Sequence, residues 1–88
     1  MSWEIRYRSS VEKDVSRLPA EVRALVLQRI VDLALDPFPA GCKKLKGAEN
    51  RFRLKVAGAY RIVYSLFEQD RLIKIEFVGH RKDAYRWF

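Results

Sequence analysis

The side chains with the clearest chemical potential are basic residues that alternate with apolar ones in the second half of the chain. Residues 51–56 read Arg-Phe-Arg-Leu-Lys-Val, and this period of two predicts a strand with apolar side chains on one face and basic side chains on the other. Arg61 lies on the next predicted strand, and the segment 79–85, Gly-His-Arg-Lys-Asp-Ala-Tyr, follows the last one. In a three-stranded meander these ends converge, which predicts an open basic cleft with Tyr85 at its rim.

Such a cleft would suit a ligand that contains phosphate. Arginine makes bidentate contacts to phosphate, and an aromatic ring offers a stacking surface for a base. Alternating basic residues such as Arg51, Arg53 and Lys55 are also typical of the solvated face of a sheet. The second group of basic residues, Arg81 and Lys82, favours the binding face over ordinary surface.

The distribution of charge along the chain points to the same kind of ligand. Residues 1–40 carry six Lys or Arg and six Asp or Glu, whereas residues 41–88 carry twelve and five. The whole net charge of +7 therefore lies in residues 41–88. This asymmetry favours a polyanionic partner, either a nucleic acid or an acidic protein.

Several other kinds of site are excluded by the composition. With a single cysteine, Cys42, and a single histidine, His80, the chain can form neither an internal disulfide nor a zinc site of three or four N/S ligands. We expect no metal and no cofactor. The first twenty residues contain no apolar run, so we expect neither a signal peptide nor a membrane span, and a cytoplasmic location.

The hydrophobic periodicity predicts a single α+β domain over residues 1–88. A strand at residues 3–8 precedes two helices, at residues 11–18 and 20–35, whose apolar residues recur at helical spacing. A basic loop at 40–50 leads to three strands, at residues 51–56, 60–67 and 72–78. The order β-α-α-β-β-β predicts a two-helix hairpin packed on one face of a mostly antiparallel four-stranded sheet, followed by a short basic C-terminal tail.

Three short segments resemble the RelE branch of the RelE/ParE toxin superfamily. They are Cys42-Lys43-Lys44-Leu45-Lys46-Gly47, Tyr60-Arg61-Ile62-Val63-Tyr64, and the segment from Phe77 through Gly79-His80-Arg81 to Tyr85. The resemblance implies a small cytoplasmic ribonuclease that enters the ribosomal A site, cuts messenger RNA and is inhibited by a cognate antitoxin protein.

The resemblance also implies roles for individual residues. The positions that match the family's catalytic residues are Arg53, Lys55, Arg61, Arg81 and Tyr85, with the tyrosine stacking on a base of the substrate. Further basic residues are expected to bind RNA: Lys43, Lys44, Lys46, Arg51 and Lys82.

Cleavage of RNA without a metal is possible when the 2′-OH of the substrate is the nucleophile. The site must then remove that proton, stabilise charge on the phosphate and protonate the leaving 5′-oxygen. Lys55 is the best candidate for the base, because neighbouring arginines should disfavour its charged form. The acid is either Arg81, which the resemblance implies, or His80, which is the chemically natural choice but more often structural.

Two other functions remain open at this point. One is the ParE branch of the same fold, which poisons DNA gyrase by binding it, and the other is a catalytically inactive member that only binds an antitoxin. The phosphate-binding cluster with a stacking ring favours the ribonuclease. For the antitoxin, the helix pair and the terminal Trp87-Phe88 are candidate docking surfaces, although Trp87 could instead pack back onto the sheet.

Overall fold

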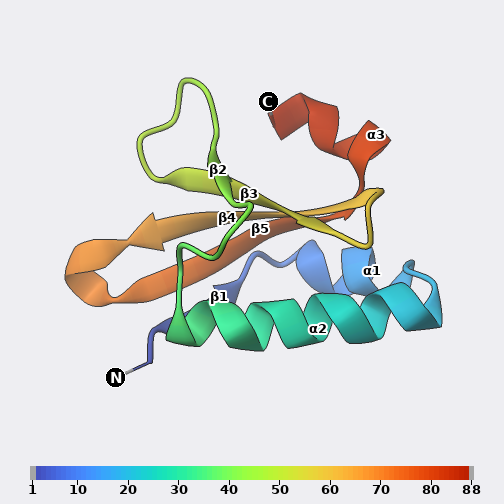
Figure 1. Cartoon of the computed structure of the whole chain (residues 1–88), viewed down its shortest axis with the longest axis horizontal. Coiled ribbons are helices and arrows are strands. Elements are labelled where there is room, and N and C mark those ends of the chain that lie inside the picture. Colours follow the sequence, from blue (N-terminus) through green and yellow to red (C-terminus); the bar gives the residue numbers. More distant parts are fainter. Residues whose placement is uncertain (1, 88) are drawn as a thin grey trace.

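The computed structural model describes residues 2–87, which form one α+β layer structure (Figure 1). Within these residues the sheet has five strands in the order β1-β5-β4-β3-β2. The strands are β1 (Glu4–Tyr7), β2 (Lys43–Lys44), β3 (Arg51–Val56), β4 (Tyr60–Phe67) and β5 (Leu72–His80). The helices are α1 (Val11–Ser16), α2 (Ala20–Leu35) and α3 (Arg81–Ala84), with 3₁₀ turns η1 at Glu68–Asp70 and η2 at Tyr85–Trp87.

The sheet confirms the predicted fold class but contains one strand more than predicted. Strands β3, β4 and β5 form the expected antiparallel meander, while β1 pairs with β5 in parallel. The additional strand β2 pairs Lys43 with Arg53 and Lys44 with Phe52. A two-residue strand has no periodicity that could reveal it, and it covers part of the outer edge of β3.

The helices α1 and α2 cover one face of the sheet and bury the main core (Figure 1). The side chains of Val26, Ile30 and Leu33 follow the helical period of α2 and are buried against apolar residues of the strands. Tyr64 is also fully buried there, and its hydroxyl donates to the carbonyl of Pro37 at 2.9 Å. This second tyrosine of the Tyr60–Tyr64 segment is therefore a core residue, and burial raises the pKa of its hydroxyl.

The opposite face of the sheet is partly covered by α3 and η2, which lie across it (Figure 1). A second, smaller apolar cluster lies beneath them and consists of Leu45, Val63, Phe77, Ala84 and Trp87. The predicted short basic C-terminal tail is folded over residues 81–87, because apolar side chains hold this segment on the sheet, and Trp87 packs back onto the sheet. In the remainder of the text this side is called the open face, because α1 and α2 do not cover it.

An irregularity in β5 shapes the open face. The pairing register between β4 and β5 shifts at Val63/Tyr64, so Glu76 is an extra residue in β5. Glu76 accepts a hydrogen bond from Ser65 Oγ at 2.8 Å, while the neighbouring Phe77 belongs to the small apolar cluster. A bulge of this kind places two successive side chains on one face. The Phe77 ring packs directly against Gly79, where a larger residue would clash, since a Cβ at Gly79 would lie 2.6 Å from Phe77 Cζ.

None of the helices formed by residues 2–87 has the length and hydrophobicity that a membrane span requires.

Candidate active site

Arg61 is the centre of the predicted basic cluster, and it is buried. Its side chain lies on the open face of β4 with only 9% of its surface exposed. The guanidinium Nη1 donates to the carbonyls of Gly58 and Tyr60, both at 2.9 Å. Arg61 is therefore not a solvated surface residue, since its side chain also stabilises the turn between β3 and β4.

Lys55 and Arg53 lie beside Arg61 on the neighbouring strand. Lys55 is the cross-strand partner of Arg61, and Arg53 lies two residues away on the same face of β3. Together with Gly41 and Lys43, these three residues line a hollow of ≈ 310 Å³. The hollow is lined by cations and one glycine, which is the composition that suits a phosphate group.

The electrostatics of Arg61 connect this hollow to α3 and η2. Burial lowers the pKa of Arg61, the charges of Arg53 and Arg81 lower it further, and Tyr85 raises it. Arg81 and Tyr85 are thus close enough to Arg61 to influence its charge. The structure brings together Arg53, Lys55, Arg61, Arg81 and Tyr85, the residues predicted to be catalytic.

Tyr85 is positioned to meet a ligand at the rim of this cluster. It is 65% exposed, although it is the first residue of η2, directly after the buried Ala84. Arg81 is held by its backbone, since its N–H donates to the carbonyl of Ala59 at 2.8 Å. An exposed aromatic ring next to a cationic hollow can stack on a base while the cations bind the phosphate.

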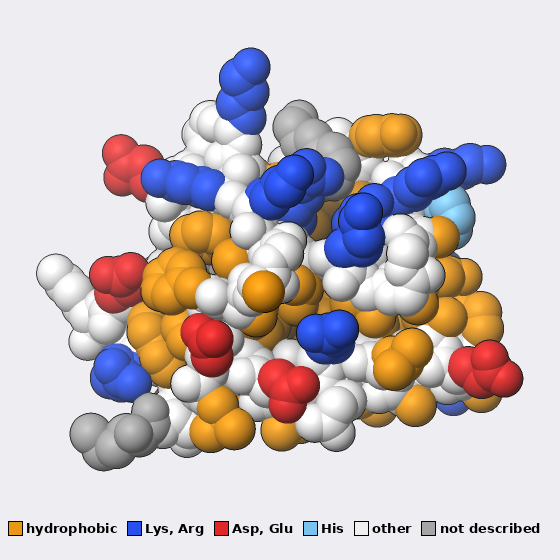
Figure 2. Space-filling model, in the orientation of Figure 1, with side chains coloured by type: hydrophobic (Ala, Val, Ile, Leu, Met, Phe, Trp, Pro, Cys, Tyr) orange, Lys and Arg blue, Asp and Glu red, His pale blue; other side chains and the backbone are white. Residues whose placement is uncertain are grey.

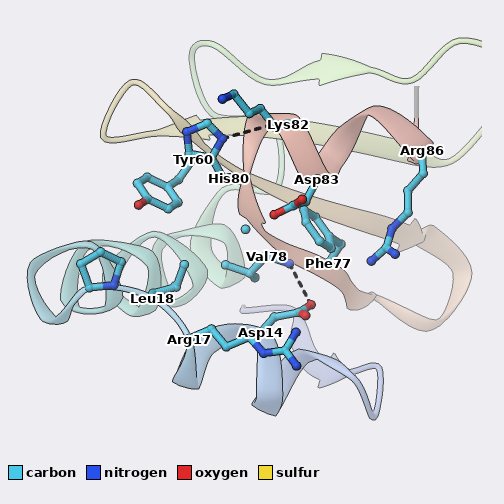
Figure 3. Close-up of a pocket in the computed structure, with 12 residues that line it drawn as sticks. Asp14, Arg17, Leu18, Tyr60, Phe77, Val78, His80, Lys82, Asp83 and Arg86 are labelled. Atoms are coloured by element: carbon cyan, nitrogen blue, oxygen red, sulfur yellow. Dashed lines mark hydrogen bonds between the residues drawn. The ribbon is translucent and has the colours of Figure 1, made fainter.

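His80 lies on the other side of the sheet from Arg61. It pairs with Tyr60, and the two rings meet edge to face at 5.5 Å. Its Nδ1 accepts a hydrogen bond from the backbone N–H of Lys82 at 3.2 Å, which caps α3 (Figure 3). This geometry gives His80 a structural role and separates it from the hollow that Lys55 and Arg61 line.

The basic residues predicted to bind RNA are spread along the open face. Lys43, Lys44, Lys46 and Lys82 are exposed. Arg51 differs from them, because its guanidinium lies 3.8 Å from the buried Glu76 carboxylate and over the ring of Trp87. Lys and Arg side chains gather over the upper part of the molecule in Figure 2, around α3 and the segment from β2 to β3.

Sequence reasoning missed two further arginines on this side of the molecule, Arg8 and Arg86. Both belong to a hollow that also contains Arg51 and Trp87. Arg8 follows β1, in the half of the chain with no net charge, so its proximity to the C-terminal turn could not be read from the sequence. The one sequence feature that pointed to this hollow was an arginine next to a tryptophan, Arg86-Trp87, near the C-terminus.

A larger cleft of ≈ 620 Å³ lies between α1 and α3 and has mixed charge (Figure 3). Its lining includes Asp14 and Asp83 as well as Arg17, Lys82 and Arg86. The Asp14 carboxylate accepts a hydrogen bond from the backbone N–H of Val78 at 3.3 Å, where β5 extends beyond its partner β1. No group of three or more His, Cys, Asp or Glu residues within 2–87 could hold a metal ion.

The fold and the basic cluster are those of a small α+β protein with a cationic hollow on the open face of its sheet. No protein-family model matches the chain. It is 28% identical to RelE1 of Methanocaldococcus jannaschii over 98% of both chains. It is 26% identical to the toxin RelG of Mycobacterium tuberculosis over 98% of this chain and 99% of that one.

Solved structures of RelE proteins have the same fold. The archaeal RelE–RelB complex from Pyrococcus horikoshii OT3 matches with a TM-score of 0.79 and 27% identity, over 92% of this chain and 97% of that one. A double mutant of the E. coli toxin RelE in the free state matches with a TM-score of 0.81 and 20% identity, over 99% of this chain and 92% of that one. The chain is therefore similar to RelE toxins over nearly its whole length and has the fold of RelE proteins.

Proposed function

We propose that this chain is the toxin of a type II toxin–antitoxin pair and that it cuts messenger RNA in the A site of the ribosome without a metal ion. The observation that carries the proposal is the cluster around Arg61. Cations from β3, β4 and α3 meet there beside the exposed ring of Tyr85. The named relatives are toxins of the same size and fold.

The proposed reaction is an attack of the substrate's own 2′-OH on the adjacent phosphorus. Lys55, in its neutral form, accepts the 2′-OH proton, the O2′–P bond forms, and the P–O5′ bond breaks to leave a 2′,3′-cyclic phosphate. Arg53 and Arg61 stabilise the extra negative charge on the phosphate oxygens. Arg81 is the proposed source of the proton for the leaving 5′-oxygen, while Tyr85 holds a neighbouring base by stacking.

Induction of the chain in cells tests this function against its two alternatives. We expect growth to stop and messenger RNA to decay, with cuts inside translated reading frames. A gyrase poison would instead produce DNA breaks, and a catalytically inactive member would leave growth unchanged. Mapping RNA ends and staining for DNA damage in the same culture separates the three outcomes. DNA breaks without messenger decay would contradict the proposal.

The proposed partner that restrains the toxin is an acidic antitoxin, and the proposed location is the cytoplasm. Relatives have been solved as toxin–antitoxin complexes. A partly disordered acidic segment would match the charge of residues 41–88. Apolar side chains exposed on α2, namely Leu27, Val31 and Leu35, could add affinity. Trp87 packs against Phe77 with ring centroids 6.3 Å apart, and Phe88 lies outside the described residues.

Co-expression with the adjacent gene tests this partner. We expect the neighbouring protein to restore growth and to co-purify with the chain, in a complex that forms faster at low salt because opposite charges attract. The same gene with an early stop codon is the control. If the neighbour's product neither binds nor rescues the cells, the toxin–antitoxin assignment loses its support and an unpaired RNA-binding protein becomes the better interpretation.

A further inference from the structure

A second group of arginines lies on the molecule around the ring of Trp87. The guanidinium carbons of Arg8 and Arg51 lie 5.4 and 5.1 Å from the centre of that ring. Arg86 lies 5.3 Å from the centre of the neighbouring Phe77 ring. With Ser10, these side chains line a hollow of ≈ 550 Å³, which we call the Trp87 hollow: Arg8, Ser10, Arg51, Arg86 and Trp87.

The Trp87 hollow has more positive charge than its surroundings neutralise. It is lined by three arginines and no acidic residue. The nearest carboxylate interaction is that of Glu76 with Arg51, at 3.8 Å, and Glu76 also accepts from Ser65. Arg8 and Arg86 are exposed. Within residues 2–87 the Nε1 of Trp87 is buried without a hydrogen-bond acceptor.

Three parts of the chain build this hollow. Arg8 lies between β1 and α1, Arg51 begins β3, and Arg86 and Trp87 belong to η2. Arg86 extends from the C-terminal turn toward α1 (Figure 3). Arg51 and Lys55 both lie on β3 with their side chains on its open face, so the Trp87 hollow and the Arg61 cluster are about 13 Å apart along that strand.

We propose that the Trp87 hollow is a second RNA subsite, which binds backbone phosphate of the strand a few nucleotides away from the cleaved bond. This inference rests on the proposed function, because it assigns a path for the same substrate. Arginine and aromatic side chains together bind single strands through phosphate contacts and stacking. An RNA is favoured over an acidic protein because the hollow continues the Arg61 cluster along one strand.

The test measures binding of a short single-stranded 2′-O-methyl RNA, which has no free 2′-OH and so is not cut. The variant combines Arg8→Ala and Arg86→Ala, two exposed side chains whose removal should leave the fold intact. The matched control is Arg71→Ala, which removes an arginine that lies 5.0 Å from the ring of Trp3, a residue that packs against the core beneath the helices.

We expect the double variant to bind this RNA at least about tenfold more weakly than the wild type. The slope of log affinity against log salt should fall by about 1.4, because two phosphate contacts are lost. Arg71→Ala should change affinity less than about twofold. Unfolding temperatures of all three proteins show whether a loss comes from misfolding.

Equal binding by the double variant and the Arg71→Ala control would overturn the subsite, as would a wild type that does not bind the RNA. Loss of antitoxin binding with unchanged RNA binding would also overturn it and assign the hollow to a protein partner. A different result would refute the proposed nuclease function without affecting the subsite. A wild type that binds RNA through Arg8 and Arg86 but never cuts on ribosomes would retain the subsite and refute the nuclease.

Discussion

Replacing Lys55 or Arg81 with alanine is expected to relieve growth arrest while the domain stays folded. Both side chains are exposed, so each substitution should change the free energy of unfolding by no more than about 0.5 kcal/mol. Each removes a group assigned to proton transfer in the cleavage reaction. Cleavage on the ribosome should fall by about 10²-fold or more, by comparison with the loss of a single transition-state donor elsewhere.

The control for this prediction is Lys13→Ala, which removes an exposed lysine on α1. Like Lys55→Ala and Arg81→Ala, it removes one positive charge. Because α1 covers the other face of the sheet, Lys13→Ala should leave growth arrest and mRNA cleavage unchanged. Circular dichroism and the rate of mRNA cleavage on programmed ribosomes are the measurements. If both cluster variants are folded and still arrest growth as well as Lys13→Ala, the cleft is wrongly assigned.

Arg61→Ala should behave differently from the other two variants, because this residue also supports the fold. Its loss removes two hydrogen bonds to the carbonyls of Gly58 and Tyr60. We expect a destabilisation of about 1–3 kcal/mol in addition to the loss of cleavage. Urea unfolding separates the two effects, and Arg61→Ala with wild-type stability would show that its contacts with the turn contribute nothing.

The burial of Arg61 illustrates what the sequence could not provide. The alternation in residues 51–56 and 60–67 correctly placed Arg53, Lys55 and Arg61 on one face, because a strand's side-chain period is two. The same alternation predicted an open basic cleft, since it contains no information about which segments cover that face. That cover is α3 and η2, which contact the sheet through Phe77, and Phe77 reaches the open face only through the bulge at Glu76.

The helical half of the fold was more predictable than the open face. The apolar period in residues 20–35 specifies which side of α2 is buried, and Val26, Ile30 and Leu33 are indeed core residues. In contrast, the side of the sheet on which His80 lies depended on whether the last strand continued past Gly79. Strand β5 does continue to His80, so the His80 side chain lies on the other face from Arg61 and caps α3. Arg81 therefore remains the proposed acid.

The proposed enzyme is expected to cut messenger RNA on programmed ribosomes far faster than it cuts the same RNA free in solution. The hollow around Arg61 is lined by Lys43, Arg53, Lys55 and Gly41, with neither a carboxylate nor an imidazole among them. Such a site stabilises charge well but is poor at proton transfer at neutral pH. It therefore depends on the ribosome to hold the 2′-OH, the phosphorus and the 5′-oxygen in line.

Positioning of this kind can lower a barrier by roughly 7–11 kcal/mol. A rate difference of about 10⁵-fold or more between ribosome-bound and free RNA is therefore expected, measured with one purified protein and one labelled message. Equal rates on the two substrates would refute the dependence on the ribosome. The slow cleavage of free RNA should be insensitive to EDTA, whereas complete inhibition by EDTA would point to a metal-dependent nuclease.

A single substitution in the substrate tests the chemistry behind this dependence. Replacing the 2′-OH at the cleaved position with hydrogen removes the proposed nucleophile, while the phosphate and the base that Arg61 and Tyr85 would bind remain. Cleavage on the ribosome should then be lost, and binding should be nearly unchanged. The normal product should carry a 2′,3′-cyclic phosphate, because O2′ is still bonded to phosphorus when the 5′-oxygen leaves. Undiminished cleavage of the 2′-deoxy substrate would require an external nucleophile, and Lys55 would then have to activate water instead.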